Sequence, residues 1–524
     1  MIRDGKAAGW LQLPAEALMP WATLNDVAFH SVAPGTAAGR GGALLANEDL
    51  HGPADHGAMA ALMTVPRELI LSLERVLEHA KVDKDFGEVL DGLSKFGRTA
   101  RGAILSFLLV QASISCPALA ERVGVHSPFT DYVKSLPLEL LPTFWTPSEL
   151  HLLIGTTLAP AVASKLRSLQ REYDLLCESA SQTRWYNLVR DHISLGDWLH
   201  VDAMYRSRAL DFPGIGHCMI PCIDLANHIA GEATIAIYEV DRNGDAVLLL
   251  RDGKTVKECE EVTITYGDEK GACEMLFSYG FLESDRHSAE TLFLSLTVPD
   301  ADIYRSAKMG IADCAPGFRL TDAGGESQQI DWSGNFIWLL CVSKDDDLRF
   351  ELARTVDGDE EMHAFYQEHR LTGGAAQLHE LLGQSPLWDV YRLRAIALLQ
   401  QRVFDQLQVL YSTQDDVEAA PHGADTDVRE VPYGQAMQLR KLEFELLERA
   451  YEEFERRKLE LAGSEVVVEY LAEVNGGGGE QQADEDALTD VNDAHGDQQP
   501  NEGAWAAVQS INEQGREPEE DDFS

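Results

Sequence analysis

The stretch "MIPCIDLANHIAGEATIAIYEV", which runs from Met219 to Val240, places polar side chains where an apolar run ends. It begins apolar, passes Asp224, Asn227 and His228, and then continues as an alternating, strand-like segment. Burial of an amide or an imidazole without hydrogen-bond partners costs free energy, so such groups are kept where they bind something. The first question about this chain is therefore what Asn227 and His228 bind.

A zinc site is one interpretation, because His217, Cys218, Cys222 and His228 are close in sequence and of suitable type. Structural zinc sites, however, usually take cysteines about two to four residues apart on turns that bring both sulfurs to the metal. The run "HCMIPCIDL" has instead the pattern of a buried strand bent by a proline, and no two cysteines form a C-x-x-C pair. The sequence therefore predicts no metal site.

Two further interpretations need no metal. A cysteine and a histidine of this stretch can form a nucleophilic pair, but neither has neighbours in sequence that would activate it. Alternatively, Asn227 and His228 only satisfy backbone groups at a turn. Taken alone, the stretch favours this last interpretation.

Segments on both sides of the stretch favour a binding site instead. Downstream, "EEVTITYGDEKGACEMLFSYGFLES" (260–284) contains Tyr266-Gly267 at the end of a predicted strand and Tyr279-Gly280-Phe281 after a short predicted helix. Upstream, "GRGGALLANEDL" (39–50) begins with a glycine-rich turn. Each of these short motifs is common by itself, but their combination in this order is specific.

In this combination the chain resembles the SET-domain methyltransferases. Within them it is most similar to the branch that contains the Rubisco large-subunit lysine methyltransferase and its ribosomal-protein, cytochrome c and histone-modifying relatives. The resemblance covers most of the chain and is carried by the G-x-G turn at 39–41, "YRSRAL" at 205–210, "IPCIDLANH" at 220–228, "AIYEV" at 236–240 and "VTITYG…LFSYGF" at 262–281. That branch also lacks a cysteine-rich zinc module.

The resemblance implies an α+β fold: a mostly β SET core, threaded in a pseudoknot-like way, with a helical insertion and an α-helical C-terminal domain. Composition adds a disordered acidic tail. The N-terminal part of the SET domain is expected at 10–75, the helical insertion at 76–204 and the C-terminal part at 205–288. A helical substrate-binding domain is expected at 289–465. The tail at 474–524 is glycine-rich, acidic and poor in apolar residues, which is typical of disorder.

The cofactor implied by the resemblance is S-adenosylmethionine. Gly39, Arg40 and Gly41 resemble the turn whose backbone approaches this cofactor, where glycine permits a positive φ. Arg208 resembles the residue that pairs with the cofactor's carboxylate. The segment "GRGGALLA" has one glycine more than many relatives, so the register of the turn is open by one residue.

The remaining site residues follow from the same resemblance. Asn227 and His228 resemble the pair that contacts the amino-acid portion and the adenine of the cofactor, with Asp224 as a nearby support and Tyr279 also counted among the cofactor-binding residues. Tyr266 resembles the catalytic tyrosine.

The channel for the substrate's lysine is expected between Tyr238 and Tyr279, with Phe281 behind them. The implied reaction is methyl transfer to the side-chain amine of a lysine in a protein. Two rivals stay open: a protein histidine methyltransferase on the same scaffold, and a catalytically silent SET-like protein that only binds partners. Since Tyr266, Asn227 and His228 are all present, the silent alternative is the less favoured one.

The charge of the chain points to the kind of partner. It has 524 residues, with 43 basic and 87 acidic ones, for a net charge of −44. Such a surface repels the phosphate backbone of nucleic acids and attracts basic proteins. We therefore expect a basic, lysine-containing protein substrate, such as a ribosomal protein, an elongation factor, cytochrome c or a histone, and no direct nucleic acid; charge that serves only solubility is the alternative.

The location of the protein is expected to be intracellular, in the cytoplasm or the nucleus. The first residues contain no long apolar segment of a secretory signal. No run of about 18 apolar residues predicts a membrane span. Cysteines without a disulfide pattern fit a reducing compartment.

Overall fold

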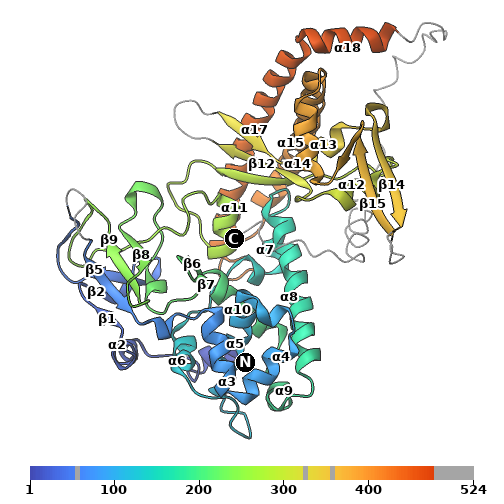
Figure 1. The fold of residues 1–524 in the computed structure, drawn as a ribbon. Coiled ribbons are helices and arrows are strands. Elements are labelled where there is room, and N and C mark those ends of the chain that lie inside the picture. The colour runs from blue at the N-terminus through green and yellow to red at the C-terminus, as the bar shows by residue number, and fades with distance from the viewer. Residues whose placement is uncertain (54–58, 323–328, 355–359, 477–524) are drawn as a thin grey trace. The chain divides into compact units, whose positions relative to one another are not determined.

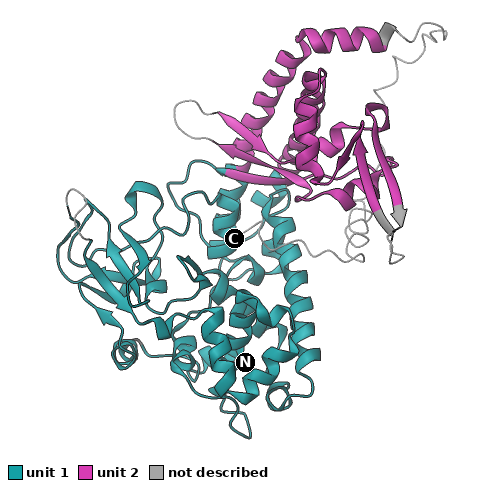
Figure 2. Cartoon of the chain, in the orientation of Figure 1, with its two compact units in different colours: residues 1–290, 413–442 teal, residues 291–412, 443–524 magenta. Residues whose placement is uncertain are grey.

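The computed structural model describes residues 1–53, 59–322, 329–354 and 360–476. The chain divides into two compact units (Figure 2): unit 1 contains Met1–Glu290 and Thr413–Leu442, and unit 2 contains Thr291–Ser412 and Glu443 onward. The predicted tail at 474–524 lies outside the described residues, except that 474–476 form the end of helix α18 (Glu465–Gly476).

The β part of unit 1 is built from short antiparallel pairs (Figure 1). Its main sheet has the order β1-β5-β9-β8, formed by Ala28–Phe29, Ala61–Val65, Ala246–Leu250 and Ala236–Val240. Three two-stranded sheets accompany it: β2-β3 (Val32–Ala37 and Gly41–Ala46), β10-β4 (Thr255–Val256 and Leu50–His51) and β6-β7 (Leu210–Phe212 and Gly216–Cys218). The strand-like segment that follows the Asn-His pair is thereby confirmed as strand β8, Ala236–Val240.

The strand predicted to end at Tyr266-Gly267, "EEVTITYG" at 260–267, is not a regular strand. It is extended, but its backbone hydrogen-bond partners change along its length. The N–H of Ala46 donates to the oxygen of Glu260, and the N–H of Val262 donates to the oxygen of Leu44. Further along, the N–H of Ala236 donates to the oxygen of Thr263. Isolated bridges, Leu45 with Glu261 and His228 with Ile264, also connect it to neighbouring segments. Alternating hydrophobicity correctly predicts the extended backbone, but it does not reveal that three different segments of the chain form hydrogen bonds with it.

Helices fill the region between the two parts of the β core. They are α3 (Leu73–Val82), α4 (Lys84–Gly92), α5 (Ala100–Ile114), α6 (Pro128–Ser135), α7 (Pro147–His151), α8 (Leu158–Ala180), α9 (Arg184–Val189) and α10 (Leu195–Arg206). Helices α1 (Ile2–Ala7) and α2 (Ala15–Leu24) precede the β core, and α11 (Ala272–Tyr279) follows it. Short 3₁₀ turns occur at Arg67–Leu69, Phe96–Arg98, Pro142–Phe144, Ile223–Leu225 and Gly231–Ala233.

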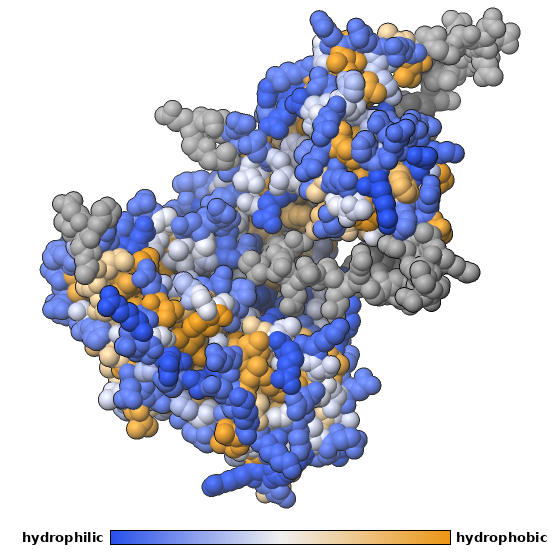
Figure 3. Space-filling view, in the orientation of Figure 1, coloured by the Kyte–Doolittle hydropathy of each residue, from blue (hydrophilic) through white to orange (hydrophobic). Residues whose placement is uncertain are grey.

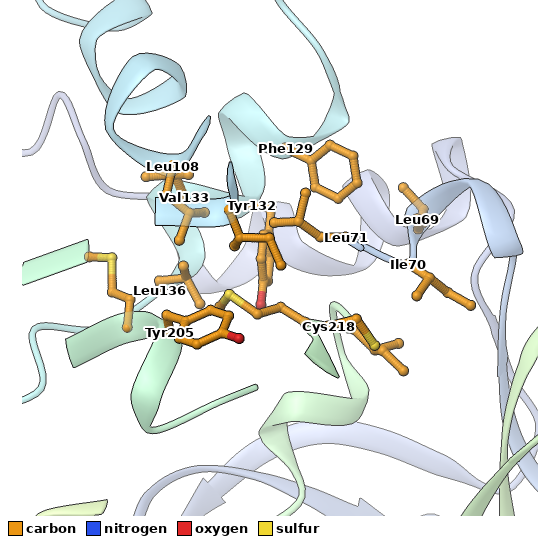
Figure 4. Packing of buried hydrophobic residues seen from close by; sticks show 14 of the residues in the cluster. Leu69, Ile70, Leu71, Leu108, Phe129, Tyr132, Val133, Leu136, Tyr205 and Cys218 are labelled. Atoms are coloured by element: carbon orange, nitrogen blue, oxygen red, sulfur yellow. The ribbon is translucent and has the colours of Figure 1, made fainter. Parts of the chain in front are cut away.

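Helix α5 is the centre of this helical region. All of its residues from Gly102 to Ser113 are buried, as expected for a helix that is apolar on every side. Its N-terminus is capped by the Thr99 hydroxyl, which accepts from the backbone N–H of Gly102 at 3.0 Å. The core is continuous with the β part: Figure 4 shows Leu108 of α5 and Tyr132 of α6 in one cluster with Cys218 of β7.

A segment from the C-terminal half of the chain completes unit 1. It comprises α16 (Gln414–Glu418) and the first part of α17 (Glu430–Ala462). Arg429 forms a bidentate ion pair with the buried Glu149, with both N···O distances at 2.8 Å. In addition, Gln438 Nε2 donates to the backbone oxygen of Glu283 at 2.9 Å. Residues 413–442, which the sequence analysis assigned to the C-terminal domain, therefore pack against the SET core.

Unit 2 contains two three-stranded antiparallel sheets, β11-β12-β13 (Thr291–Ser295, Gly317–Asp322, Ile330–Ser333) and β14-β15-β16 (Leu348–Arg354, Glu360–Tyr366, His369–Leu371). Its helices are α12 (Arg305–Ile311), α13 (Phe336–Cys341), α14 (Gly374–Gly383), α15 (Trp388–Ser412), the rest of α17, and α18, with a 3₁₀ turn at Lys344–Asp346. The sequence analysis described 289–465 as helical and missed these strands. The alternation in "LRFELAR" (348–354) is the signal that indicates one of them.

The α+β fold class predicted from the sequence is confirmed. Within the described part of the chain, no helix is both long and apolar enough to cross a membrane. On the face in view in Figure 3, hydrophilic residues cover most of the described surface, and apolar side chains gather in a few patches of unit 1.

A buried charge cluster ties three helices of unit 1 together. The Asp202 carboxylate on α10 pairs with Arg101 of α5 at 2.7 Å and with Lys165 of α8 at 3.2 Å. Arg206 pairs with the same carboxylate at 3.1 Å. Burial by itself raises the pKa of Asp202, but the three cations outweigh it and hold that pKa well below its ordinary value. Asp202 therefore remains ionised across the physiological pH range.

Asp202→Asn should destabilise unit 1 by about 3–5 kcal/mol, because it leaves buried cations without their central carboxylate. Because the pKa of Asp202 is lowered by folding, its contribution is present at neutral pH and is lost as the pH falls below about 4. Urea unfolding of both proteins at neutral pH measures the difference.

Asp91→Asn is the matched control. Its carboxylate pairs with Arg98 on the surface at 2.8 Å, and such a pair contributes about 1 kcal/mol or less. Equal stability losses in the two variants would contradict the importance of the buried cluster.

Candidate active site

Two segments that are distant in sequence lie side by side at the centre of the candidate site. The backbone N–H of Ile264 donates to the oxygen of Asn227 at 3.0 Å, and the N–H of Ile229 donates to the oxygen of Ile264 at 3.0 Å. This short parallel bridge between His228 and Ile264 brings the Asn-His pair next to Tyr266.

The imidazole of His228 is held on both sides. Its Nδ1 accepts the backbone N–H of Tyr266 at 3.0 Å, and its Nε2 lies 3.2 Å from Oε1 of Glu283. Because Nδ1 accepts, the proton is on Nε2, which donates to Glu283. The side chain of His228 is 0% exposed, so both contacts are shielded from water.

The carboxylate of Glu283 is charged in this arrangement. Burial by itself raises its pKa, but hydrogen bonds from His228 and Arg286 outweigh burial and hold the pKa well below the ordinary value. Arg286 Nε donates to the second carboxylate oxygen at 2.7 Å. The sequence analysis did not identify Glu283.

Aromatic rings surround the imidazole. The ring of Tyr266 stacks on His228 with a centroid distance of 5.1 Å, and Tyr279 packs against Tyr266 at 4.6 Å. Phe281 lies 6.3 Å from His228 and 6.5 Å from Tyr279. The four predicted residues thus form one aromatic cluster, and Gly280, in the left-handed conformation with φ +77°, ends α11 between two of them.

The hydroxyl of Tyr266 donates to the backbone oxygen of Ala226 at 3.0 Å. Burial raises the pKa of Tyr266 to about 12, so its phenol is neutral at physiological pH. Since the proton is used in this bond, the lone pairs of the oxygen are available to accept a hydrogen bond from a ligand.

Tyr238 of β8 belongs to the same neighbourhood. Its ring stacks on Phe212 at 5.5 Å, and burial raises its pKa. Burial also raises the pKa of Tyr279, and the nearby Tyr266 and Tyr238 raise it further.

The amide of Asn227 connects the centre of the site to the β2-β3 hairpin. Its Nδ2 donates to the backbone oxygen of Gly42 at 3.1 Å and to Glu261. Glu261 in turn lies 3.4 Å from the Arg40 guanidinium at the hairpin turn. Gly42 is one of the adjacent glycines that left the register of the turn open, and its carbonyl is the group that Asn227 contacts.

The hairpin turn itself needs glycine at two positions. Gly39 has φ +76° and Gly41 has φ +78°, in the region that other residues rarely adopt. A Cβ at either position would meet no atom within 4 Å, so backbone conformation and not crowding requires glycine there.

Arg208 lies between two acidic residues. Its Nη1 donates to the backbone oxygen of Asp224 at 2.7 Å, and its Nη2 donates to Glu139 at 2.7 Å. Burial alone would lower the pKa of Arg208, but the charges of Asp224 and Glu139 outweigh it and raise that pKa. The Asp224 carboxylate also accepts the hydroxyl of Tyr132 at 2.7 Å, although burial raises the pKa of Asp224.

The Nε–H group of Arg208 has no acceptor in the described part of the site. Its Nε is buried and has no hydrogen-bond partner among the described residues. An unsatisfied guanidinium N–H in a buried position costs free energy that an anionic ligand would recover.

A pocket of about 340 Å³ opens next to the aromatic cluster. Tyr279 and Gly280 line it, together with Glu139, Leu140, Leu141, Arg429, Glu430, Val431, Pro432 and Gln435. The start of α17 therefore forms one wall of a cavity beside the tyrosines.

The structure also bears on the two cysteine interpretations. Burial raises the pKa of Cys218 to about 12, and it raises the pKa of Cys222 as well, so both sulfurs are protonated thiols. A nucleophilic role is not favoured in that state. In the described part of the chain, no three His, Cys, Asp or Glu side chains gather as a metal site would require.

Sequence reasoning missed the acidic partners of this site: Glu139, Glu261 and Glu283. Nothing in the local sequence distinguishes them from the other acidic residues. Their roles depend on which cation or amide the fold brings near them.

No protein-family model matches the chain. SET domain-containing protein 8 of Schizosaccharomyces pombe is 32% identical over 281 residues, which are 52% of this chain and 60% of that protein. The [fructose-bisphosphate aldolase]-lysine N-methyltransferase of Arabidopsis thaliana is 26% identical over 58% of this chain and 59% of its own length.

The solved structure of Rubisco LSMT bound to AdoMet superimposes with a TM-score of 0.61 at 19% identity, over 90% of this chain and 98% of that one. The chain therefore has the SET fold, and the resemblance to the Rubisco large-subunit methyltransferase-like branch is confirmed. The chain spans about three fifths of the length of the first two curated relatives.

The Nε2-protonated form of His228 should depend on Glu283. Glu283→Ala removes the acceptor, so the imidazole loses its preferred tautomer and its contact with the Tyr266 N–H. ¹⁵N spectra of histidine-labelled protein should show one Nε2–H form in the parent and exchange between forms in the variant. Glu274→Ala, which breaks the neighbouring pair with Lys270, is the control and should leave His228 unchanged; unaltered His228 signals in Glu283→Ala would refute the assignment.

Proposed function

We propose that this protein transfers a methyl group from S-adenosylmethionine to the side-chain amine of a lysine in a protein substrate. The observation that carries the proposal is the neutral Tyr266 phenol, fixed on the Ala226 carbonyl and stacked on His228, beside a pocket lined by Tyr279. A bound S-adenosylmethionine supplies a methyl group activated by an adjacent sulfonium.

The residues present fit this cofactor. The buried Nε of Arg208 is a free donor for its carboxylate. Asn227 and the Gly39-Arg40-Gly41 turn present polar backbone and side-chain groups on the same side of the site. His228 and Tyr279 are assigned to its remaining contacts, with Asp224 holding Arg208 in place.

Tyr266 acts as the group that orients the acceptor. Its proton is engaged with Ala226, so its oxygen accepts an N–H of the incoming amine and leaves the amine's lone pair free to point at the methyl group. Correct orientation of two reacting groups accounts for several kcal/mol of a barrier, which makes positioning the main contribution of this residue.

The acceptor amine must lose a proton before it can react. A free lysine has a pKa near 10.4, and burial among Tyr238, Tyr279 and Phe281 favours the neutral form. These three rings form the walls of the channel in our proposal. A histidine acceptor, with a pKa near 6.5, needs less assistance, so analysis of the methylated product separates the two activities.

The substrate is proposed to be a basic protein. The net charge of −44 favours lysine-rich partners such as a ribosomal protein, an elongation factor, cytochrome c or a histone, and disfavours nucleic acid. All eight cysteines are free thiols, which supports action in a reducing compartment, the cytoplasm or the nucleus, away from membranes.

The cofactor assignment is tested by removing both polar groups of the pair. Asn227→Ala combined with His228→Ala should abolish binding of S-adenosylmethionine while the far-ultraviolet circular dichroism stays close to that of the parent. Titration calorimetry measures the affinity. Undiminished affinity in the double variant would contradict the site.

The role of Tyr266 is tested by removing only its oxygen. Tyr266→Phe should keep cofactor affinity within about twofold, because those contacts lie on Arg208, Asn227 and His228. The methyl-transfer rate should fall by about 10²-fold, the usual consequence of a misplaced reacting group. Both kcat and kcat/KM should fall together.

Tyr279→Phe is the matched control for this experiment. If Tyr279 shapes the channel, its variant should change the number of methyl groups added more than the rate of the first transfer. Normal turnover in Tyr266→Phe would show that the catalytic role belongs to another residue.

A further inference from the structure

Unit 2 contains a second pocket, of about 400 Å³, that belongs to neither part of the SET core. Its lining residues come from the β13 end, α13, α14, α15 and α17: Trp332, Ser333, Gly334, Asn335, Trp338, His379, Trp388, Arg392, Ile396, Arg457 and Leu461. The volume lies in the range of small-ligand sites.

Aromatic rings form the body of this pocket. Trp338 is 4% exposed and forms the floor; His379 stacks on it at 4.5 Å and Trp388 packs against it at 5.0 Å. Trp332 packs against the same ring at 5.9 Å, with an interplanar angle of 43°. Three indoles that gather around one cavity offer a large apolar surface for a planar or branched group.

The backbone at Gly334 allows this arrangement. It has φ +147°, and a Cβ there would lie 2.8 Å from the carbonyl oxygen of Gly317. Glycine is therefore required where the chain turns from Trp332 on β13 toward Trp338 on α13.

The lining carries positive charge only; its uncharged polar side chains, such as Ser333 and Asn335, both donate and accept. It contains two arginines and no carboxylate. Arg392 Nη1 donates to Asp389 at 3.2 Å, which leaves most of its five N–H groups for a ligand, and its side chain is 48% exposed. Arg457 is anchored by Glu453 and by the backbone oxygen of Ile330 at 2.8 Å.

The indole N–H groups add to this donor set. Among the described residues, no acceptor bonds the N–H of Trp332, Trp338 or Trp388. Burial lowers the pKa of His379, so its imidazole is neutral and adds no charge. A ligand that matches the pocket must therefore bring acceptors, and a cation would meet two guanidinium groups.

We propose that this pocket binds a carboxylate that is attached to, or adjacent to, an aromatic or branched apolar group. The apolar part lies on the tryptophans and the carboxylate bonds Arg392. Two sources have this chemistry: a small aromatic acid, or an aromatic residue flanked by Asp or Glu in a protein. The proposal concerns unit 2 alone and does not depend on methyl transfer.

Two probes distinguish the sources. The first is phenylacetate, and the second is the peptide acetyl-Gly-Glu-Phe-Glu-Gly-amide. Titration of the full chain, without S-adenosylmethionine, should change the tryptophan emission in a saturable way, with the dissociation constant confirmed by calorimetry. A peptide that binds about tenfold or more tightly than phenylacetate identifies a protein ligand, and equal affinities identify a small acid.

Variants test the assigned contacts. Arg392→Gln should weaken the better probe by about tenfold, the loss of one charge-assisted hydrogen bond. Trp388→Ala should weaken it at least as much, whereas Trp388→Phe should retain most of the affinity. Arg349→Gln, an exposed arginine on β14 outside the pocket, is the control and should have no effect.

Three results would overturn the proposal. They are the absence of saturable binding by both probes, equal affinity in Arg392→Gln and the parent, or tighter binding of acetyl-Gly-Lys-Phe-Lys-Gly-amide or trimethyllysine than of the acidic probes. None of them bears on Tyr266 or on cofactor binding, which are measured separately.

Discussion

The short parallel bridge between residues 227–229 and Ile264 is the interaction on which the candidate site depends. It joins two segments separated by more than thirty residues and brings Asn227 and His228 close to Tyr266. Because Ile264 is fixed, the Tyr266 N–H reaches His228, and because Ala226 is fixed, its carbonyl orients the Tyr266 hydroxyl. The bridge thus brings the pair proposed to bind the cofactor next to the tyrosine proposed to be catalytic, without any regular sheet between them.

The charges of the site form a balanced network. Arg208 is shared between Asp224 and Glu139, and Glu283 is shared between His228 and Arg286. Arg208 lies between the carboxylates of Asp224 and Glu139, and its buried Nε–H has no acceptor among the described residues. The carboxylate of the proposed cofactor is an anionic acceptor of the kind that this N–H lacks.

The fold could be predicted from the sequence where a motif fixes both residue type and backbone. The glycines at 39 and 41 require positive φ, and Asn-His after an apolar run requires a ligand or a partner, so both were recognisable. The glutamates at 139, 261 and 283 could not be recognised as site residues from the sequence. In a chain with 87 acidic residues, nothing local indicates which ones lie beside a cation or an amide. The strand-like run at 260–267 was predicted as extended, but its change of partners is a tertiary property.

In the C-terminal half, too, the sequence predicts local structure better than tertiary contacts. Helices α15 and α17 carry apolar residues at helical spacing, a pattern typical of core, and Leu399, Val403 and Leu446 are buried. The strands β14 and β15 were not predicted, although apolar and polar side chains alternate over residues 348–352. The alternation is short and lies in a region whose other segments have helical spacing. The tryptophan pocket could not be predicted at all: Trp332, Trp338 and Trp388 are far apart in sequence and meet only in the fold.

One measurement tests the central claim most directly. A lysate from cells that lack this protein is incubated with the purified chain and S-adenosylmethionine labelled in its methyl group, and the labelled protein is then sequenced by mass spectrometry. The account predicts label on the side-chain nitrogen of a lysine in a basic protein, and initial labelling about 10²-fold slower when Tyr266→Phe replaces the parent at equal concentration. Label on histidine, or equal labelling by the Tyr266→Phe variant, would contradict it.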